Sequence, residues 1–262
     1  MLTDMAHVLV TEELAESGIE LLRSRGHDVQ VRLDLSPADL RSHISEVDAL
    51  IVRSATQVDA QLLEAGNRLQ VVGRAGVGLD NVDTTAATAR GILVCNAPES
   101  NVVSAAEHSV GLLLALARNV AQAHGALMAG RWERSLWTGV ELLNKTVGIV
   151  GLGRVGRLVA QRLSGFDLQI LAFDPFVSPE SAREVNAEIV DLDDLLGRSD
   201  FVTVHLPKTE ETVGLFDAAR FSKFKSGAFL VNAARGGVIV EDDLADALSK
   251  GQLAGAALDV FD

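Results

Sequence analysis

The stretch that decides the fold is Val147-Gly148-Ile149-Val150-Gly151-Leu152-Gly153-Arg154-Val155-Gly156. Its apolar first half predicts a strand, its Gly-x-Gly-x-x-Gly pattern a tight turn, and the residues from Arg154 onward a helix. In this arrangement Gly151 allows the turn, Gly153 lets the backbone approach a pyrophosphate, and Gly156 lets the helix pack against the strand. Because the first N–H groups of a helix are unpaired and carry partial positive charge, the pattern predicts that the phosphates of a dinucleotide bind there.

An acidic residue follows the glycines at the distance typical of a dinucleotide site. A second strand is predicted over residues 169–173, and Asp174 stands at its carboxyl end, about 20 residues beyond the turn. A carboxylate there can accept hydrogen bonds from the adenosine ribose and repels a 2′-phosphate, so the pattern predicts NAD rather than NADP. A purely structural strand–helix unit would explain the glycines but would leave the acid unexplained.

The composition predicts a globular chain of one large or two ordinary domains. The chain has 262 residues, of which 48% are hydrophobic, and its formal net charge is −13. This charge argues against nucleic-acid or anionic-membrane partners, so an anionic substrate would need a local cluster of arginines. No apolar run approaches the roughly 18 residues that span a bilayer, and residues 1–7 lack the basic start of a secretory signal.

Cysteine and histidine usage favours a reducing compartment and predicts no metal site. Cys95 is the only cysteine, which excludes an intrachain disulfide and favours a cytoplasmic location. Its place in the apolar run of residues 92–96 predicts a small, buried side chain. The histidines are scattered along the chain without metal-ligand spacing, so no metal is expected.

The first part of the chain alternates short apolar runs with amphipathic stretches. Near-continuous apolar strands separated by helices imply a parallel sheet that is covered on both faces. The strands are predicted at residues 7–11, 28–33, 49–53, 69–72 and 92–96, and the helices at 12–24, 37–43, 59–66 and 84–90.

A second alternating series follows a long helix, predicted over about residues 102–129 and expected to lie between two domains. Its strands are predicted at residues 146–151, 169–174, 188–190, 201–205, 228–232 and 255–260, and its helices at 154–163, 192–198, 218–224 and 241–249. The sequence therefore predicts an α/β fold with two doubly wound parallel-sheet domains, residues 1–98 and 99–262. A ligand of such a sheet is expected outside the carboxyl ends of the strands.

Several further segments resemble the D-isomer-specific 2-hydroxyacid dehydrogenases. The resemblance implies a flavodoxin-like substrate domain, a Rossmann NAD-binding domain, and reversible hydride transfer between NAD and the 2-position of a D-2-hydroxy acid. Within the family it implies oxidation of D-3-phosphoglycerate to 3-phosphohydroxypyruvate, the entry step to serine. The segments are Val52–Thr56, Gly73–Asp83, Asn96–His108, Gly130–Arg134, Gly151–Gly156, His205–Thr209, Asn232–Gly237 and Ala257–Phe261.

The family's catalytic groups are an arginine, a histidine and a glutamate, and only the arginine has a match here. Arg235 follows a predicted strand and precedes Gly236-Gly237, where the backbone lets a ligand come close. The resemblance implies that its guanidinium binds the substrate carboxylate and carbonyl through paired hydrogen bonds. The glutamate, the histidine and the segment that completes the first domain match no residue printed here, so we expect NAD binding but little turnover from this chain. His108 and His205 are interpreted as structural.

The substrate-binding residues implied by the resemblance come largely from the first domain. Arg53 and Arg74 each end a predicted strand, and two arginines there suit a phosphate dianion. From the residues alone, pairing of these arginines with nearby acids is an equal alternative, and the resemblance favours the phosphate. The other residues implied are the backbone of Val77 and Gly78, the side chain of Asn101, and Arg134, which would reach a neighbouring subunit or else remain a solvated arginine.

The cofactor-binding residues implied by the resemblance all lie in the second domain. Arg154 and Val155 would meet the pyrophosphate beside Gly151, Gly153 and Gly156, Asp174 would bind the ribose, and the nicotinamide half would contact Leu206, Ala233, Ala234, Arg235 and Asp259. The expected partners are a phosphorylated 2-hydroxy acid and further copies of the chain in a homodimer or homotetramer. Two alternatives remain open: a sister dehydrogenase of the glyoxylate or hydroxypyruvate reductase type, and a non-catalytic NAD-binding protein.

Overall fold

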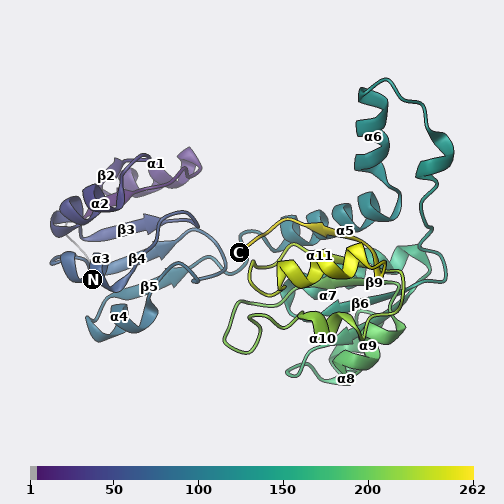
Figure 1. Ribbon diagram of the computed structural model, residues 1–262. Coiled ribbons are helices and arrows are strands. Elements are labelled where there is room, and N and C mark those ends of the chain that lie inside the picture. Colours follow the sequence, from purple (N-terminus) through teal and green to yellow (C-terminus); the bar gives the residue numbers. More distant parts are fainter. Residues whose placement is uncertain (1–4) are drawn as a thin grey trace. The chain divides into compact units, whose positions relative to one another are not determined.

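The computed structural model describes residues 5–262, which form two compact units (Figure 1). The first unit ends at Asn101, and the second runs from Val102 to Asp262. Both are parallel α/β sheets with helices on their faces. The predicted fold class is confirmed.

The first unit has a five-stranded parallel sheet of order β2-β1-β3-β4-β5. This order places the first strand inside the sheet and is the flavodoxin-like form of a doubly wound fold. Its strands are β1 (His7–Val10), β2 (Asp28–Val31), β3 (Ala49–Val52), β4 (Val71–Arg74) and β5 (Leu93–Asn96), and its helices are α1 (Glu16–Ser24), α2 (Pro37–His43), α3 (Ala60–Ala65) and α4 (Thr84–Ala89). A 3₁₀ turn over Ile44–Glu46 follows α2.

The helix starts in the first unit follow local capping chemistry. Ser36 accepts a hydrogen bond from the backbone N–H of Asp39, and Pro37 occupies the first turn of α2. Asp59 and Asp83 cap α3 and α4 in the same way, by accepting from the backbone N–H three residues on. These caps are readable in the sequence because they depend only on neighbouring residues.

One face of this sheet is covered only in part, which corrects the expectation for Cys95. On that face α1 packs over β1 and β2 and reaches the edge of β3, burying Ile19 with Val8 and Val10. The edge strand β5 lies outside this cluster, so Leu93 is 62% exposed and Cys95 is exposed as well. The expectation of a buried Cys95 was wrong because an apolar strand does not reveal which of its faces is covered.

The second unit has a six-stranded parallel sheet of order β11-β10-β9-β6-β7-β8. The strand order reverses between β6 and β9, which is the switch point where doubly wound sheets bind ligands. Its strands are β6 (Thr146–Val150), β7 (Gln169–Phe173), β8 (Ala187–Ile189), β9 (Phe201–Val204), β10 (Ala228–Asn232) and β11 (Leu253–Leu258).

Helices cover both faces of this second sheet. On one face α5 (Val102–Ala117), α7 (Arg154–Leu163) and α8 (Pro179–Arg183) pack around a cluster that includes Leu113, Ile149 and Leu163. On the other face α9 (Leu192–Arg198), α10 (Ala218–Phe221) and α11 (Glu241–Ser249) pack on Leu195, Val202 and Leu230. Apolar strands buried on both faces are typical of an all-parallel sheet.

The single long helix expected over residues 102–129 is instead two helices, α5 and α6 (Val120–Met128). Asn119 lies between them in the left-handed region, with φ 53°, which asparagine tolerates better than most residues. The backbone N–H of Val140 donates to the carbonyl of Ala117 at 2.7 Å, so the last turn of α5 is bonded outside the helix. Apolar periodicity continues across the break and therefore does not reveal it.

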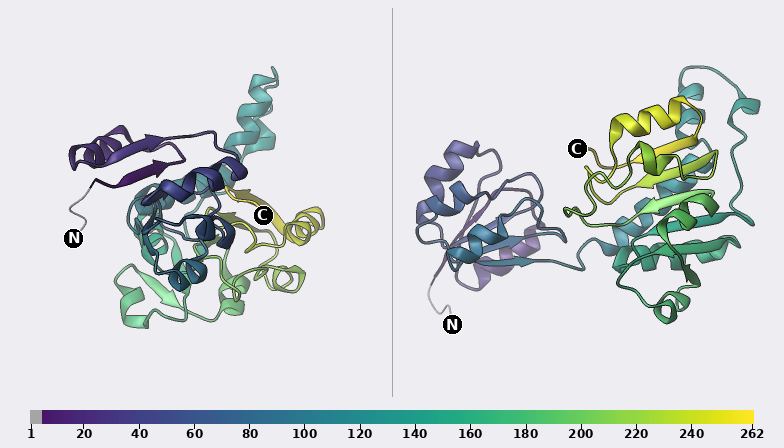
Figure 2. Two further views of the ribbon diagram at one scale, coloured as in Figure 1. Left: turned by 90° about the vertical axis from the view of Figure 1, so that its left-hand side faces the viewer. Right: turned by 60° about the horizontal axis from the view of Figure 1, so that its bottom comes forward.

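Residues 120–137, here called the arm, comprise α6 and a short 3₁₀ helix (Arg134–Trp137). The arm projects from the rest of the second unit in Figure 1 and in the left view of Figure 2. Its exposed apolar side chains include Met128, Trp132 and Leu136. Among residues 5–262, every helix is too short or too polar to cross a bilayer.

Candidate functional site

The glycine turn joins β6 to α7 at the switch point of the second sheet. Gly151 has φ +97°, and its backbone N–H donates to the carbonyl of Phe173 at 2.8 Å. A Cβ at this position would lie 2.8 Å from the carbonyl oxygen of His205. Both the positive φ and the neighbouring β9 loop therefore require glycine here.

The other two glycines of the pattern differ in what surrounds them. A Cβ at Gly156 would overlap the carbonyl of Gly151 and lie 3.2 Å from a methyl group of Ile149, so this glycine brings α7 close to β6. At Gly153 a Cβ would meet no heavy atom of the described residues within 4 Å. The open space at Gly153 lies at the start of α7, where a phosphate can approach the helix N-terminus.

Asp174 lies beside this turn, as the sequence spacing predicts. One carboxylate oxygen accepts the backbone N–H of Leu152 at 2.9 Å, and the other accepts that of Phe176 at 2.9 Å. The paired register of Val150 with Phe173 brings the ends of β6 and β7 together. The open cradle at Gly153 and the adjacent carboxylate fit the pyrophosphate and ribose of a dinucleotide.

Arg235 lies in a turn that a buried asparagine shapes. Asn232, the last residue of β10, accepts the backbone N–H of Ala234 at 3.0 Å and donates its amide to the carbonyl of Arg235 at 3.0 Å. The Arg235 guanidinium donates to the carbonyl of Ala234 at 2.7 Å. Sequence reasoning did not identify Asn232. Asparagine side chains often accept a hydrogen bond from the backbone N–H two residues later, and this is a recognised turn signal.

Asp259 follows β11 and is held next to the same turn. Its backbone N–H donates to the carbonyl of Asn232 at 3.0 Å. Its carboxylate lies 3.1 Å from the imidazole of His108 on α5. The resemblance implied a nicotinamide contact for Asp259 but only a structural role for His108, and the structure brings the two side chains together.

His205 lies where the chain leaves β9, beside the glycine turn. Its backbone N–H donates to Val150 at 2.8 Å, and its imidazole hydrogen-bonds the Thr203 hydroxyl at 3.1 Å. Burial lowers the pKa of His205 to about 4, because the cationic form is poorly solvated there. At neutral pH the ring is uncharged, which supports its interpretation as a packing and orienting residue. The next residue, Leu206, is partly buried and extends toward Gly151.

Acidification is expected to destabilise the wild-type chain more than a His205→Gln variant. The unfolded imidazole is protonated near its usual pKa of 6.5, whereas the folded one is protonated only near a pKa of about 4. The unfolded state binds more protons between these values, so stability falls with falling pH, by up to about 3 kcal/mol for this group. Urea unfolding at about pH 7 and about pH 4.5 measures the difference. An equal loss in both proteins would contradict a buried neutral imidazole.

Arg53 and Arg74 lie at the carboxyl edge of the first sheet. Arg74 is the last residue of β4 and pairs in register with Val52, which Arg53 directly follows. Arg53 is exposed, and its guanidinium donates to the Glu13 carbonyl at 3.5 Å. The Arg74 guanidinium fills the space that a side chain at Gly76 would need. The two arginines thus end adjacent strands, as predicted from the parallel pattern.

Glu12 and Asn81, two residues that sequence reasoning did not assign to the site, hold the loop that carries Arg53. The Glu12 carboxylate accepts backbone N–H groups of Arg53, Ala55 and Thr56 at 2.7, 3.0 and 3.0 Å. The buried Asn81 amide donates to the carbonyls of Arg53 and Thr56 at 2.8 and 2.7 Å. Partial burial alone would raise the pKa of Glu12, but these backbone hydrogen bonds outweigh it and lower the pKa.

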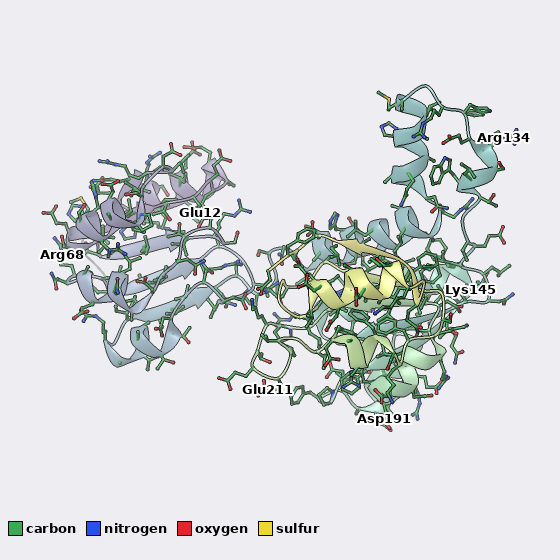
Figure 3. The ribbon with its side chains drawn as sticks, in the orientation of Figure 1. Glu12, Arg68, Arg134, Lys145, Asp191 and Glu211 are labelled. Carbon is green, nitrogen blue, oxygen red and sulfur yellow. The ribbon has the colours of Figure 1, made fainter. Side chains whose placement is uncertain are left out.

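The remaining predicted substrate residues lie on loops and on the arm. The Val77 carbonyl accepts the Asn96 amide at 2.6 Å, which fastens the loop of Val77 and Gly78 to the end of β5. Asn101 is exposed immediately before α5. Arg134 is exposed on the arm, where Figure 3 labels it.

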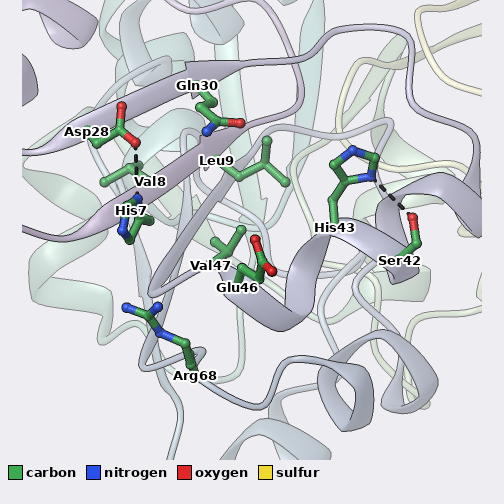
Figure 4. Close-up of a pocket in the computed structure, with 10 residues that line it drawn as sticks. All are labelled: His7, Val8, Leu9, Asp28, Gln30, Ser42, His43, Glu46, Val47 and Arg68. Carbon is green, nitrogen blue, oxygen red and sulfur yellow. Dashed lines mark hydrogen bonds and ion pairs between the residues drawn. The ribbon is translucent and has the colours of Figure 1, made fainter.

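A cavity of about 540 Å³ lies in the first unit over the amino-terminal halves of β1 and β2 (Figure 4). His7 and Asp28 form an ion pair of 3.0 Å at its wall. Arg68, also in the wall, binds the buried carboxylate of Asp48 through two nitrogens. His7 is thus paired with Asp28 and Arg68 with Asp48, and these residues lie at the strand ends opposite to Arg53, so the cavity is separate from the arginine edge.

Comparison with known proteins identifies the class. Residues 110–262 match the model of the D-isomer specific 2-hydroxyacid dehydrogenase, NAD binding domain. The chain belongs to this family, and its second unit carries the family's NAD-binding domain with the glycine turn described above.

Relatives and solved structures agree with this assignment. The chain is 51% identical over 260 residues to D-3-phosphoglycerate dehydrogenase of Mycobacterium leprae, covering 98% of this chain and 49% of that protein. It is 46% identical over 255 residues to the Archaeoglobus fulgidus protein of the same name, covering 97% and 48%. The chain thus spans about half the length of the curated relatives it matches. An NAD-dependent formate dehydrogenase from Staphylococcus aureus in complex with NAD has a TM-score of 0.88 and 34% identity, covering 98% of this chain and 82% of that one.

Proposed function

We propose that this chain provides the NAD and substrate sites of an enzyme that oxidises D-3-phosphoglycerate to 3-phosphohydroxypyruvate, the entry step to serine. The observation that carries the proposal is the pair Arg53 and Arg74 at the carboxyl ends of adjacent strands. In the second unit, Arg235 follows β10 at the same edge of the sheet as the glycine turn that follows β6. The names of the relatives that are about half identical to this chain support the same substrate.

The substrate roles divide between residues 1–98, proposed as the substrate-binding domain, and residues 99–262, proposed as the NAD-binding domain. Arg53 and Arg74 would bind the phosphate, while Arg235 would bind the carboxylate and the oxygen at C2. The backbone N–H groups of Val77 and Gly78 and the Asn101 amide would bind the other carboxylate oxygen.

The cofactor roles follow the two halves of the dinucleotide. The first turn of α7, with Gly151, Gly153, Arg154, Val155 and Gly156, would bind the pyrophosphate, and Asp174 would bind the ribose. Leu206, Ala233, Ala234 and Asp259 would line the nicotinamide half. Bound NAD would supply the hydride acceptor for C2 of the substrate, and the hydroxyl proton would have to pass to a base.

His205 and His108 are not proposed as the base that takes this proton. With a pKa of about 4, the partly buried His205 is a weak base, and the His108 imidazole contacts Asp259. We therefore propose that residues 1–262 bind NAD and support little turnover by themselves. Calorimetric NAD binding with negligible NADH formation is the expected result for the 262-residue chain. Turnover by these 262 residues equal to that of one of the full-length relatives would contradict it.

Arg53→Ala and Arg74→Ala test the phosphate site. Each variant is expected to lower kcat/KM for D-3-phosphoglycerate by about 10- to 100-fold, since a charge-assisted hydrogen bond contributes about 1.5–3 kcal/mol. Oxidation of D-glycerate, which lacks the phosphate, should change less than about threefold. Steady-state NADH formation, in a protein that contains this chain together with a complete catalytic segment, measures both. A matched loss for both substrates would contradict phosphate binding and would favour a sister dehydrogenase for an unphosphorylated acid.

We propose that the arm joins copies of the chain into a homodimer or homotetramer. Met128, Trp132 and Leu136 are 74, 75 and 64% exposed, which makes the arm the site of several large apolar side chains. Trp132→Glu with Leu136→Glu is expected to raise the dimer dissociation constant about 100-fold or more. Light scattering after gel filtration measures the mass. Phe176→Glu changes a 96% exposed residue outside the arm and is the control. This variant should leave the mass of the assembly unchanged. An unaltered assembly in the arm variant would contradict the proposal.

The single cysteine favours a reducing compartment, and we propose a cytoplasmic location on that basis. Cell fractionation tests it.

A further inference from the structure

A histidine outside the glycine turn contacts a residue of the proposed nicotinamide site. The imidazole Nε2 of His108, on α5, lies 3.1 Å from Oδ1 of Asp259. We propose that His108 is a positioning residue, which orients the Asp259 carboxylate so that its other oxygen receives the carboxamide of bound nicotinamide. The inference rests on the proposed function, because it takes Asp259 to face the nicotinamide half.

The backbone on both sides of this pair is fixed. His108 lies within the helix α5, which packs against β10 and β11. Asp259 follows β11 directly, and its backbone N–H is bonded to the carbonyl of Asn232 at 3.0 Å. Rotation of the Asp259 side chain therefore remains the main freedom, and the 3.1 Å contact with the His108 imidazole restricts it.

The chemistry of the two groups suits this role. A carboxylate has two oxygens that accept hydrogen bonds, and His108 engages Oδ1. On the nicotinamide ring the carboxamide supplies the N–H donors, so the second oxygen can accept one of them. An imidazole can donate from Nε2 whether it is neutral or protonated, so orientation does not need a charge on His108.

The exposure of the pair argues against a stabilising role. The side chains of His108 and Asp259 are 51% and 50% exposed. Ion pairs in such solvated positions contribute little to stability. The contact is therefore better explained by orientation of the Asp259 carboxylate than by a contribution to the free energy of folding.

His108→Leu and His108→Gln test the proposal in the 262-residue chain. Leucine removes the donor, whereas the glutamine amide can still donate to Asp259. Dissociation constants are measured by calorimetry for NAD, for 3-acetylpyridine adenine dinucleotide, which lacks the carboxamide N–H groups, and for ADP-ribose, which lacks nicotinamide. His108→Leu is expected to weaken NAD binding about 10-fold and to change the binding of the other two ligands less than about twofold. His108→Gln should stay within about threefold of wild type for NAD.

The outcomes separate this inference from the proposed function. If the wild-type chain binds NAD and ADP-ribose but His108→Leu shows no selective loss of NAD binding, only the positioning role is overturned. An equal loss for all three ligands also overturns it, because that pattern indicates damage to the whole site. A wild-type chain that binds neither NAD nor ADP-ribose overturns the proposed function, and the inference falls with it.

Discussion

Replacing Arg235 by alanine is expected to lower kcat/KM for the 2-hydroxy acid by about 10²- to 10⁴-fold, measured as NADH formation in a longer protein that contains this chain. The guanidinium would make two charge-assisted hydrogen bonds to the substrate, each contributing about 1.5–3 kcal/mol. Because Asn232 shapes the turn through the backbone, the loop should keep its conformation without the arginine side chain. NAD affinity is therefore expected to change much less than turnover.

Two further variants sharpen this prediction. Arg235→Lys keeps the charge but loses the forked geometry, so a partial loss of turnover is expected. Arg198 pairs with Glu188 and Asp194 on the surface of the same unit, and Arg198→Ala should leave turnover unchanged. An Arg235→Ala protein that retains more than a tenth of wild-type kcat/KM would be inconsistent with substrate binding by this residue.

The second large effect is expected from Gly153→Ala, which should weaken NAD binding by about 100-fold or more. Among the residues that the structure describes, no heavy atom lies within 4 Å of a Cβ at Gly153. The φ of this residue is −73°, a value that any amino acid can adopt. The added methyl group would therefore be harmless to folding but would occupy the space through which a pyrophosphate reaches the first turn of α7. Unchanged thermal unfolding together with lost NAD binding, measured by calorimetry, is the expected combination.

Gly156→Ala is the matched control, since the same methyl group is added three residues later. Here the Cβ would overlap the carbonyl of Gly151, so α7 must move away from β6. Overpacking of this kind costs about 1–3 kcal/mol, and the variant should unfold at a lower temperature. A Gly153→Ala protein that binds NAD as tightly as wild type would exclude the close approach of phosphate at this turn.

The parts of the structure that could be predicted are those governed by neighbouring residues or by the geometry of parallel strands. The glycine turn and its helix follow from one short stretch, and Asp174 falls beside it because β6 and β7 pair in register. Arg53 and Arg74 lie at one edge because Arg53 directly follows β3 and Arg74 ends β4, and the two strands are parallel. In each case spacing along the chain determines proximity in space.

The contacts that could not be predicted join residues far apart in the chain. The Glu12 carboxylate binds the loop of Arg53 to Thr56, and Asn81 binds its carbonyls from another segment. The pairing of His108 with Asp259 likewise depends on how α5 packs on β11. A sequence shows which of these residues can form hydrogen bonds but not which partner the fold brings near.

The break at Asn119 shows a different limit. The residues on both sides favour a helix, so local propensity predicts one continuous element over residues 102–129. The left-handed conformation at Asn119 and the hydrogen bond from Val140 to Ala117 end α5 early and direct α6 into the arm. Tertiary contacts outweigh propensity at this point.

The most direct test of the central claim is a substrate comparison in a longer protein that contains this chain. NADH formation, followed by its near-ultraviolet absorbance, is measured with D-3-phosphoglycerate, D-glycerate and D-lactate at equal concentrations. A kcat/KM for D-3-phosphoglycerate at least about 10-fold above the other two is expected, because two arginines would bind its phosphate. Faster turnover of D-lactate or D-glycerate would contradict the proposed function.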